Sequence, residues 1–119
     1  MSRTASTELL GRIADRLKAL ADPTRLRILH ALEDGERNVG ELLAAIGGSQ
    51  ANLSKHLARM RLAGIVRARR EGANVYYRVV DATAFAVCRT VCDALEQRAE
   101  SERTLMAGAR GRLGGGLSR

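Results

Sequence analysis

The stretch Ser49–Gly64, SQANLSKHLARMRLAG, decides how the rest of the chain is interpreted. Ser49 is a favourable helix N-cap, and Gly64 is a favourable residue just after a helix C-terminus. Apolar residues recur every three or four positions between them, as on the buried side of an amphipathic helix: Leu53, Leu57, Met60 and Leu62 or Ala63. The opposite side carries amides, hydroxyls and cations that can donate to base edges and phosphates: Gln50, Asn52, Ser54, Lys55, His56, Arg59 and Arg61. We therefore predict that this stretch is a DNA-recognition helix.

The positive charge of the chain is concentrated around that helix. The formal net charge of the 119 residues is +7. Between Ser49 and Arg78 there are seven Lys and Arg residues and one acid, Glu71, and from Arg103 to the end there are four Arg residues and no acid. A basic patch with a basic tail favours a polyanion such as double-stranded DNA as the partner.

The residues before the recognition helix predict two longer helical segments. Thr7–Ala21 has apolar residues at alternating spacings of three and four, which form a narrow seam suited to another helix: Leu10, Ile13, Leu17 and Leu20. Asp22 is then a favourable N-cap, followed by Pro23 at the first helical position. This second helix is expected to run to about Glu33 and to bury Leu26, Leu29 and Leu32.

A short third helix leads into the recognition helix. Asn38 is a favourable cap for Val39–Ile46, and Gly47-Gly48 makes a turn before Ser49. Two short helices joined by a glycine turn, with a basic and polar outer side on the second, form a helix-turn-helix pattern.

After Gly64 the pattern becomes extended. Ile65–Arg70 and Val75–Val80 are rich in β-branched or aromatic residues and flank Glu71–Asn74, which predicts a two-stranded hairpin. Its cations would form a basic wing beside the recognition helix: Arg67, Arg69, Arg70 and Arg78. Arg67 and Arg69 are expected on the same side of the hairpin, because their spacing matches the period of a strand.

The end of the chain is expected to hold one more helix and a tail. Asp81 is placed to cap a helix from Ala82 to about Met106, and residues 107–119 are too rich in glycine to fold alone, so we expect a disordered tail. Residues 1–106 then form one domain, mainly α, with five helices and a two-stranded wing. No apolar run is long enough for a membrane span and no signal-type segment begins the chain, so a cytoplasmic protein without a membrane partner is expected.

Residues 10 to 100 resemble the ArsR/SmtB family of winged-helix transcriptional repressors. The resemblance rests on LKALADPTRLRILHAL and on VGELLAAIGGSQANLSKHLARMRLAGIVRARREGANVYYRV. It implies a homodimer that pairs through its first and last helices, binds a near-palindromic operator and leaves DNA when an effector binds. The apolar pattern of the first helix also indicates a dimer, because its seam needs a partner and a small domain has few faces to cover it.

The familiar metal sites of that family are absent. The Cys-Val-Cys of its arsenic type corresponds here to Asn38, Val39 and Gly40. The zinc ligands of its last helix correspond to Asp81, Thr83, Ala94 and Gln97, of which only the aspartate is retained. We therefore expect no zinc, nickel or cobalt at either site.

Cys88 and Cys92 are the only cysteines, four residues apart on the expected last helix. Two thiolates one turn apart can hold a soft metal or a trivalent metalloid, or react with an oxidant or a persulfide. The same positions belong to a helix-pairing seam with Phe85, Leu95 and Ala99, where cysteine is often a small buried apolar residue. Sensing and packing both remain open, and so does an effector that involves no cysteine.

Ten residues are the candidate DNA contacts: Ser49, Gln50, Asn52, Ser54, Lys55, His56, Arg59, Arg67, Arg69 and Arg70. Gln50, Ser54 and Lys55 are the base-edge candidates, and the wing arginines are better suited to phosphates or the minor groove. His56 suits a phosphate contact or packing, and His30 suits packing or partial exposure rather than metal binding.

Two other functional classes remain as alternatives. A winged-helix module whose basic side binds RNA or a protein would show no preference for its own promoter, and aromatic residues at 3% offer no obvious platform for stacking single-stranded bases. An enzyme is not expected, because the two histidines lie in separate helices and neither a nucleophile-base set nor a phosphate-binding glycine loop is present.

Overall fold

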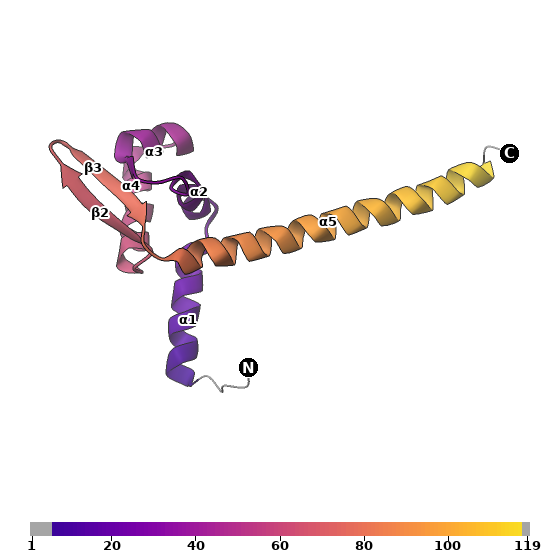
Figure 1. Ribbon diagram of the computed structural model, residues 1–119, viewed down its shortest axis with the longest axis horizontal. Helices are drawn as coiled ribbons and strands as arrows, with labels where there is room; N and C mark the ends of the chain where they lie inside the picture. The colour runs from indigo at the N-terminus through magenta and orange to yellow at the C-terminus, as the bar shows by residue number, and fades with distance from the viewer. Residues whose placement is uncertain (1–5, 118–119) are drawn as a thin grey trace. The chain divides into compact units, whose positions relative to one another are not determined.

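The computed structural model describes residues 6–117, with side chains described for residues 6–109. The chain divides into two compact units, one ending at Phe85 and the other beginning at Ala86. The first unit holds four helices: α1 (Thr7–Leu20), α2 (Pro23–Ala31), α3 (Val39–Ile46) and α4 (Gln50–Leu62) (Figure 1). The predicted helix-turn-helix is therefore formed by α3 and α4.

Each of these helices begins at a polar cap. The side chains of Ser6, Asp22, Asn38 and Ser49 accept hydrogen bonds from the backbone N–H groups three residues further on, at 2.8 to 3.1 Å. Three of these caps were predicted, and they are confirmed. At α3 the side chain of Glu41 returns a bond to the backbone N–H of Asn38, at 2.9 Å, which completes a capping box.

The predicted hairpin is confirmed, with its strands at β2 (Val66–Glu71) and β3 (Asn74–Val79). Gly72 takes a φ of +62° in the two-residue loop between them, the backbone that glycine favours at the first position of a type II′ turn. A third short strand, β1 (Arg37–Asn38), pairs antiparallel with β3, so the sheet order is β1-β3-β2. We did not predict β1, because two residues carry no strand pattern and their pairing depends on where the chain folds back.

The core lies where the helices and the sheet meet. Its buried residues come from all four helices, from the start of the hairpin and from the beginning of the last helix: Ala19, Leu20, Ile28, Leu29, Leu32, Leu42, Leu53, Leu57, Met60, Ile65, Val66 and Ala84. The expected burial of Leu26 is wrong, and of the two alternatives given for the end of α4, Leu62 and Ala63, only Ala63 is partly buried. Leu26 is 37% exposed, and at the end of α4 Leu62 is 87% exposed while Ala63 is half-buried. On α1 only the last residue of the predicted seam, Leu20, is buried within this unit.

The last helix, α5 (Ala82–Leu117), is longer than expected. The Asp81 side chain accepts a hydrogen bond from the Thr83 N–H at 3.0 Å, so the predicted cap is confirmed. The helix passes Met106 and continues to Leu117 through most of the stretch that we expected to be a disordered tail, while residues 118–119 lie outside the described residues. No proline interrupts it, and glycine costs a helix only about 1 kcal/mol per residue.

No helix within residues 6–117 combines the length and the apolar character that a membrane span requires.

Candidate DNA-binding surface

The polar side of α4 faces solvent. Leu53, Leu57 and Met60 are 1%, 0% and 0% exposed, which fixes the rotation of the helix about its axis. Its exposed residues include five that the sequence predicted as DNA contacts: Gln50, Asn52, Ser54, Lys55 and Arg59. Ser49 is exposed as well, and because its hydroxyl oxygen only accepts the capping bond from Asn52, both its O–H and its backbone N–H are left to donate to a phosphate.

His56 does not share this exposure. Its side chain is 15% exposed, and its Nδ1 atom lies 3.1 Å from Nη1 of Arg25 and 3.8 Å from Oδ2 of Asp22. The ring therefore joins α4 to the start of α2, and the predicted phosphate contact does not fit this position. The alternative that we gave for His56, packing, agrees with it.

Arg25 connects three helices, a role that the sequence did not reveal. Its Nε donates to the carbonyl of Ala19 at 2.7 Å and its Nη2 to that of Lys18 at 3.2 Å, so it closes the C-terminal end of α1 while it contacts His56. Its backbone N–H is bonded to Asp22, which lowers the pKa of that carboxyl, and the charges of His56 and Arg25 add to this effect. The segment ADPTR thus joins α1, α2 and the recognition helix.

The wing divides its cations between the two sides of the sheet. Register pairs Arg67 with Arg78 and Arg69 with Tyr76, so all four side chains share one side, and the prediction that Arg67 and Arg69 do so is confirmed. Arg70 lies on the other side, that of buried Val66. Arg67 and Arg70 are exposed and have no hydrogen bond or ion pair with any residue in the described part of the chain.

Arg69 differs because its charge is already paired. Its Nε donates to Oε2 of Glu36 at 2.9 Å and its Nη2 to Oε1 at 2.6 Å, while Nη1 is bonded to Glu71. The guanidinium carbon lies 4.7 Å from the centre of the Tyr76 ring. These bonds lower the pKa of Glu36 and raise the pKa of Arg69. Arg69 is therefore poorly placed for the phosphate contact that the sequence predicted.

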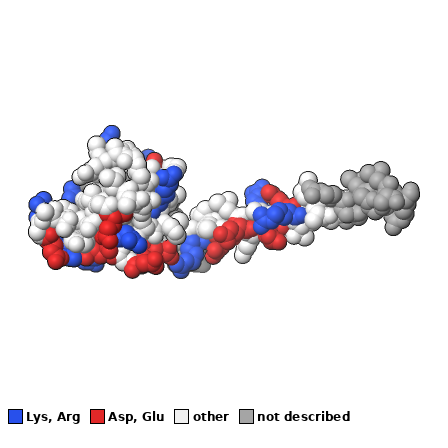
Figure 2. Space-filling model, turned by 90° about the horizontal axis from the view of Figure 1, so that it is seen from above, with Lys and Arg blue, Asp and Glu red and all other residues white. Residues whose placement is uncertain are grey.

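Charge of both signs is found elsewhere on the protein surface. The face in Figure 2 shows acidic side chains among basic ones, rather than one uniform basic area.

Asp81 is paired with Arg16, and Asn38 caps α3. Asn38 and Asp81, two of the residues at positions of the resembled family's metal ligands, thus have structural partners here. Among the side chains that the structure describes, no three His, Cys, Asp or Glu are grouped to hold a metal ion.

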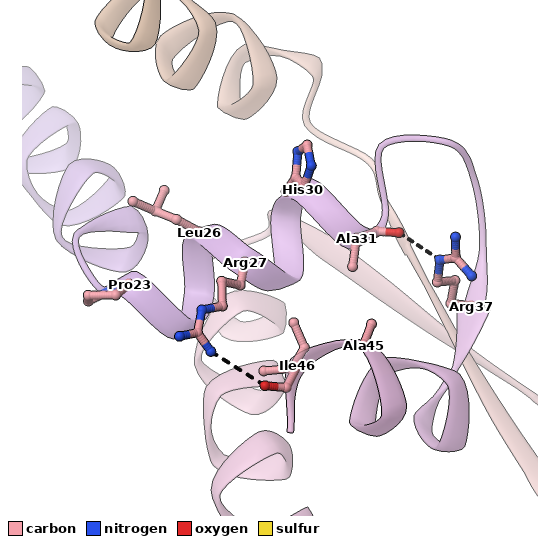
Figure 3. A pocket seen from close by; sticks show the side chains of 8 residues that line it. All are labelled: Pro23, Leu26, Arg27, His30, Ala31, Arg37, Ala45 and Ile46. Atoms are coloured by element: carbon pink, nitrogen blue, oxygen red, sulfur yellow. Dashed lines mark hydrogen bonds between the residues drawn. The ribbon is translucent and has the colours of Figure 1, made fainter. Parts of the chain in front are cut away.

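A shallow pocket of about 610 Å³ lies between α2 and α3. Arg27 donates from Nη1 to the carbonyl of Ile46 at 3.4 Å, and Arg37 donates from Nε to that of Ala31 at 2.8 Å. Figure 3 shows Arg27 reaching toward Ile46 while His30 points away from it. The exposed His30 ring is instead 3.3 Å from a carboxylate oxygen of Glu33. The cations around this pocket close helix ends and do not converge on one point.

The two free cysteines lie on α5, with Cys88 half-buried and Cys92 exposed. The Cys92 thiol donates to Oε1 of Glu96 over 3.5 Å. This hydrogen bond and the negative charge of Glu96 raise the pKa of Cys92, with a smaller contribution from Asp93. The thiolate of Cys92 is therefore disfavoured at neutral pH, which slows its reaction with oxidants.

Comparison with known proteins agrees with this architecture. Residues 22–68 match the model for "Bacterial regulatory protein, arsR family". The HTH-type transcriptional regulator KmtR of Mycobacterium tuberculosis is 39% identical over 67 residues, which is 56% of this chain and only about half, 52%, of KmtR.

Two solved structures are similar over more of their length. One is the AntR antimony-specific transcriptional repressor, with a TM-score of 0.75 and 32% identity over 84% of this chain and 92% of that one. The other is the homodimeric winged helix-turn-helix DNA-binding domain of Mb0332 from Mycobacterium bovis. Its TM-score is 0.68, with 34% identity over 82% of this chain and 95% of that one. The recognition helix, its wing and these relatives together lead to one conclusion: the chain belongs to the arsR family of bacterial transcriptional regulators.

Proposed function

We propose that this protein is a dimeric repressor that binds a near-palindromic operator in the bacterial cytoplasm. The observation that carries the proposal is the exposed polar side of α4, held in place by three fully buried residues. Gln50, Ser54 and Lys55 read base edges in the major groove, and Asn52 assists them. Arg59, Arg67 and Arg70 contact phosphates, together with the backbone N–H of Ser49.

Exposed apolar residues on two helices support the dimer. On α1, Leu10, Ile13 and Leu17 are 54%, 45% and 47% exposed, at the spacing of a helix-pairing seam. On α5, Val91 and Leu95 are 53% and 62% exposed. A second copy of the chain would cover these residues, and the similar Mb0332 domain is described as homodimeric. Two recognition helices related by two-fold symmetry match an operator with two half-sites.

DNA binding is tested by fluorescence anisotropy on the duplex upstream of the protein's own gene, in competition with a scrambled duplex. The chain has only two lysines, and these form a matched pair. Lys55→Ala on α4 should weaken operator binding at least tenfold, while Lys18→Ala on α1 should leave it within about twofold, because only Lys55 lies on the recognition surface. Equal binding to both duplexes would instead favour the RNA-binding or protein-binding alternative.

For the effector, we propose a trivalent metalloid or another thiophilic species at Cys88 and Cys92. Their spacing of four residues allows two sulfur ligands on one side of α5, and a similar repressor, AntR, is named antimony-specific. A metalloid that binds sulfur displaces the thiol proton, so the raised pKa of Cys92 does not prevent binding. The competing proposal, release by a ligand that uses no cysteine, is favoured by the lack of a third ligand beside the thiols among the described side chains.

The two effector proposals are separated by adding antimonite, arsenite, a persulfide donor or a mild oxidant to the protein–operator complex. The cysteine proposal expects release of the reduced wild type and no release of a Cys88→Ser, Cys92→Ser double variant. Release of both proteins, or of neither, would assign the cysteines to helix packing.

A further inference from the structure

We propose that Glu36 is a positioning residue for DNA binding, which holds the wing in place through Arg69. This inference rests on the proposed function. It has an unusual consequence, because Glu36 carries the same sign of charge as DNA and should nevertheless be required for tight binding.

The contact joins segments that are distant in the sequence. Glu36 directly precedes β1, and Arg69 lies on β2, with β3 between the two strands in the sheet. The Arg69 side chain therefore crosses β3, passing over Tyr76, to reach Glu36. One side chain links the hairpin to the segment that connects α2 with the sheet.

The geometry of this contact is that of a strong ion pair. Two guanidinium nitrogens meet the two oxygens of one carboxylate at 2.9 and 2.6 Å. Paired bonds of this kind fix direction as well as distance, which a single contact between point charges does not. Glu71 and the Tyr76 ring hold the same guanidinium from other sides, so its position is well defined.

Few other interactions fix the outer half of the hairpin. At its inner end, Ile65 and Val66 are buried at 0% and 2% exposure. Every residue from Arg69 to Asn74 is exposed, so no apolar anchor holds this end. β1 pairs with β3 only at Tyr76 and Tyr77, so beyond them the hairpin has two strands, which alone are marginally stable in water. The Arg69–Glu36 pair is thus the contact that sets where the outer hairpin, with Arg70, lies.

Electrostatics alone predicts the opposite role for Glu36. Arg69 lies between Glu36 and Glu71, so two carboxylates face one guanidinium, and Arg78 acts on Glu36 from the neighbouring strand. Removing a carboxylate from this region should strengthen DNA binding if Glu36 only repels phosphates. Removing it should weaken binding if Glu36 positions the wing. The two explanations therefore predict opposite changes in DNA affinity when the Glu36 carboxylate is removed.

The test measures operator affinity of the full-length protein and its Glu36→Gln variant by anisotropy. We expect affinity to fall about threefold or more at low salt, and the difference from the wild type to shrink as salt rises, because salt screens the Arg69–Glu36 pair that positions Arg70. Asp34→Asn is the matched control. Asp34 is exposed, lies two residues away and has no partner within the described residues, so its loss should leave affinity unchanged or slightly higher.

A second background makes the test independent of any general effect on folding. In an Arg69→Gln protein the pair no longer exists, so Glu36→Gln should now leave affinity unchanged or raise it. If Glu36→Gln lowered operator affinity equally in the wild-type and Arg69→Gln backgrounds, the proposal would be overturned. A gain in affinity from Glu36→Gln in the wild type would overturn it as well. If the wild type fails to prefer its operator, the proposed function itself is wrong, which is a different result.

Discussion

The recognition helix and the wing are positioned by different forces. Three residues of α4 are buried at 1% exposure or less, and His56 adds a contact to α2. The outer wing has no buried residue, and its Arg69 is held at the surface, 48% exposed, by two carboxylates and a ring. Burial of apolar area is insensitive to moderate salt, whereas exposed ion pairs are screened over about 8 Å at physiological ionic strength. One half of the DNA-binding surface should therefore be rigid at any salt concentration, and the other half should loosen as salt rises.

The largest expected effect is on the core below α4. Leu57→Ala removes a fully buried side chain and should lower the free energy of unfolding by about 2–5 kcal/mol. Urea denaturation followed by circular dichroism measures this change. Leu62→Ala, the same substitution at an 87% exposed position of the same helix, should change it by no more than about 0.5 kcal/mol. Similar losses from both would mean that burial does not hold α4.

The next effect separates the wing arginines by their partners. Arg70→Ala should weaken operator binding and make the salt slope shallower by about one, because an unpaired cation that contacts a phosphate is lost. Arg69→Gln should weaken binding with a slope change clearly smaller than one, since its charge is already paired with Glu36 and Glu71 and it acts only through the position of Arg70. Titration at four or more salt concentrations gives the slopes. A slope change of one for Arg69→Gln would show that this side chain leaves Glu36 to contact DNA.

A smaller effect concerns the free protein. Raising salt from 0.05 to 0.5 M should speed amide hydrogen exchange at the outer end of β2 and β3, because screening weakens the pairs of Arg69. Exchange in the middle of α4 should not change. Peptide-resolved mass spectrometry can follow both regions in one sample. Equal acceleration in the two regions would remove the distinction between them.

The smallest effect is on acid sensitivity. The pKa of Asp22 is lowered chiefly by the backbone N–H of Arg25, and the pKa of Glu36 chiefly by the side chain of Arg69. Because both folded-state pKa values lie below those of the unfolded chain, the stability that these groups contribute is present above the unfolded pKa values of about 4 and is lost as pH falls below them through the lowered folded-state values. Asp22→Asn and Glu36→Gln should each flatten the decline of unfolding free energy between pH 5 and pH 3.

Salt distinguishes the two carboxylates further. Denaturation curves in 1 M NaCl should reduce the difference between Glu36→Gln and wild type, while most of the difference between Asp22→Ala and wild type persists, because alanine removes the hydrogen bond from the Arg25 N–H, which is less sensitive to screening than an exposed ion pair. If salt abolished both differences, Asp22 would act through its neighbouring charges instead.

The sequence by itself determined the local elements and the orientation of α4. Ser49, Asn38 and Asp22 cap the helices that they were expected to cap, because a cap depends on backbone groups within three residues. The hairpin lies within one residue of its predicted bounds, since strand pattern and turn chemistry are also local. The polar side of α4 followed from the helical period, which sets its buried side as well.

Only the tertiary structure decided which of these polar residues are free to contact DNA. Arg69 and Arg70 are adjacent and chemically identical, yet Arg69 is paired with a carboxylate 33 positions earlier and Arg70 has no partner among residues 6–109. His56 and Lys55 are also neighbours, and one is turned to α2 while the other faces solvent. Strand β1 likewise exists because β3 lies beside it. Charge pairing and burial depend on distance in space, and residues far apart in the sequence leave no periodic trace of such contacts.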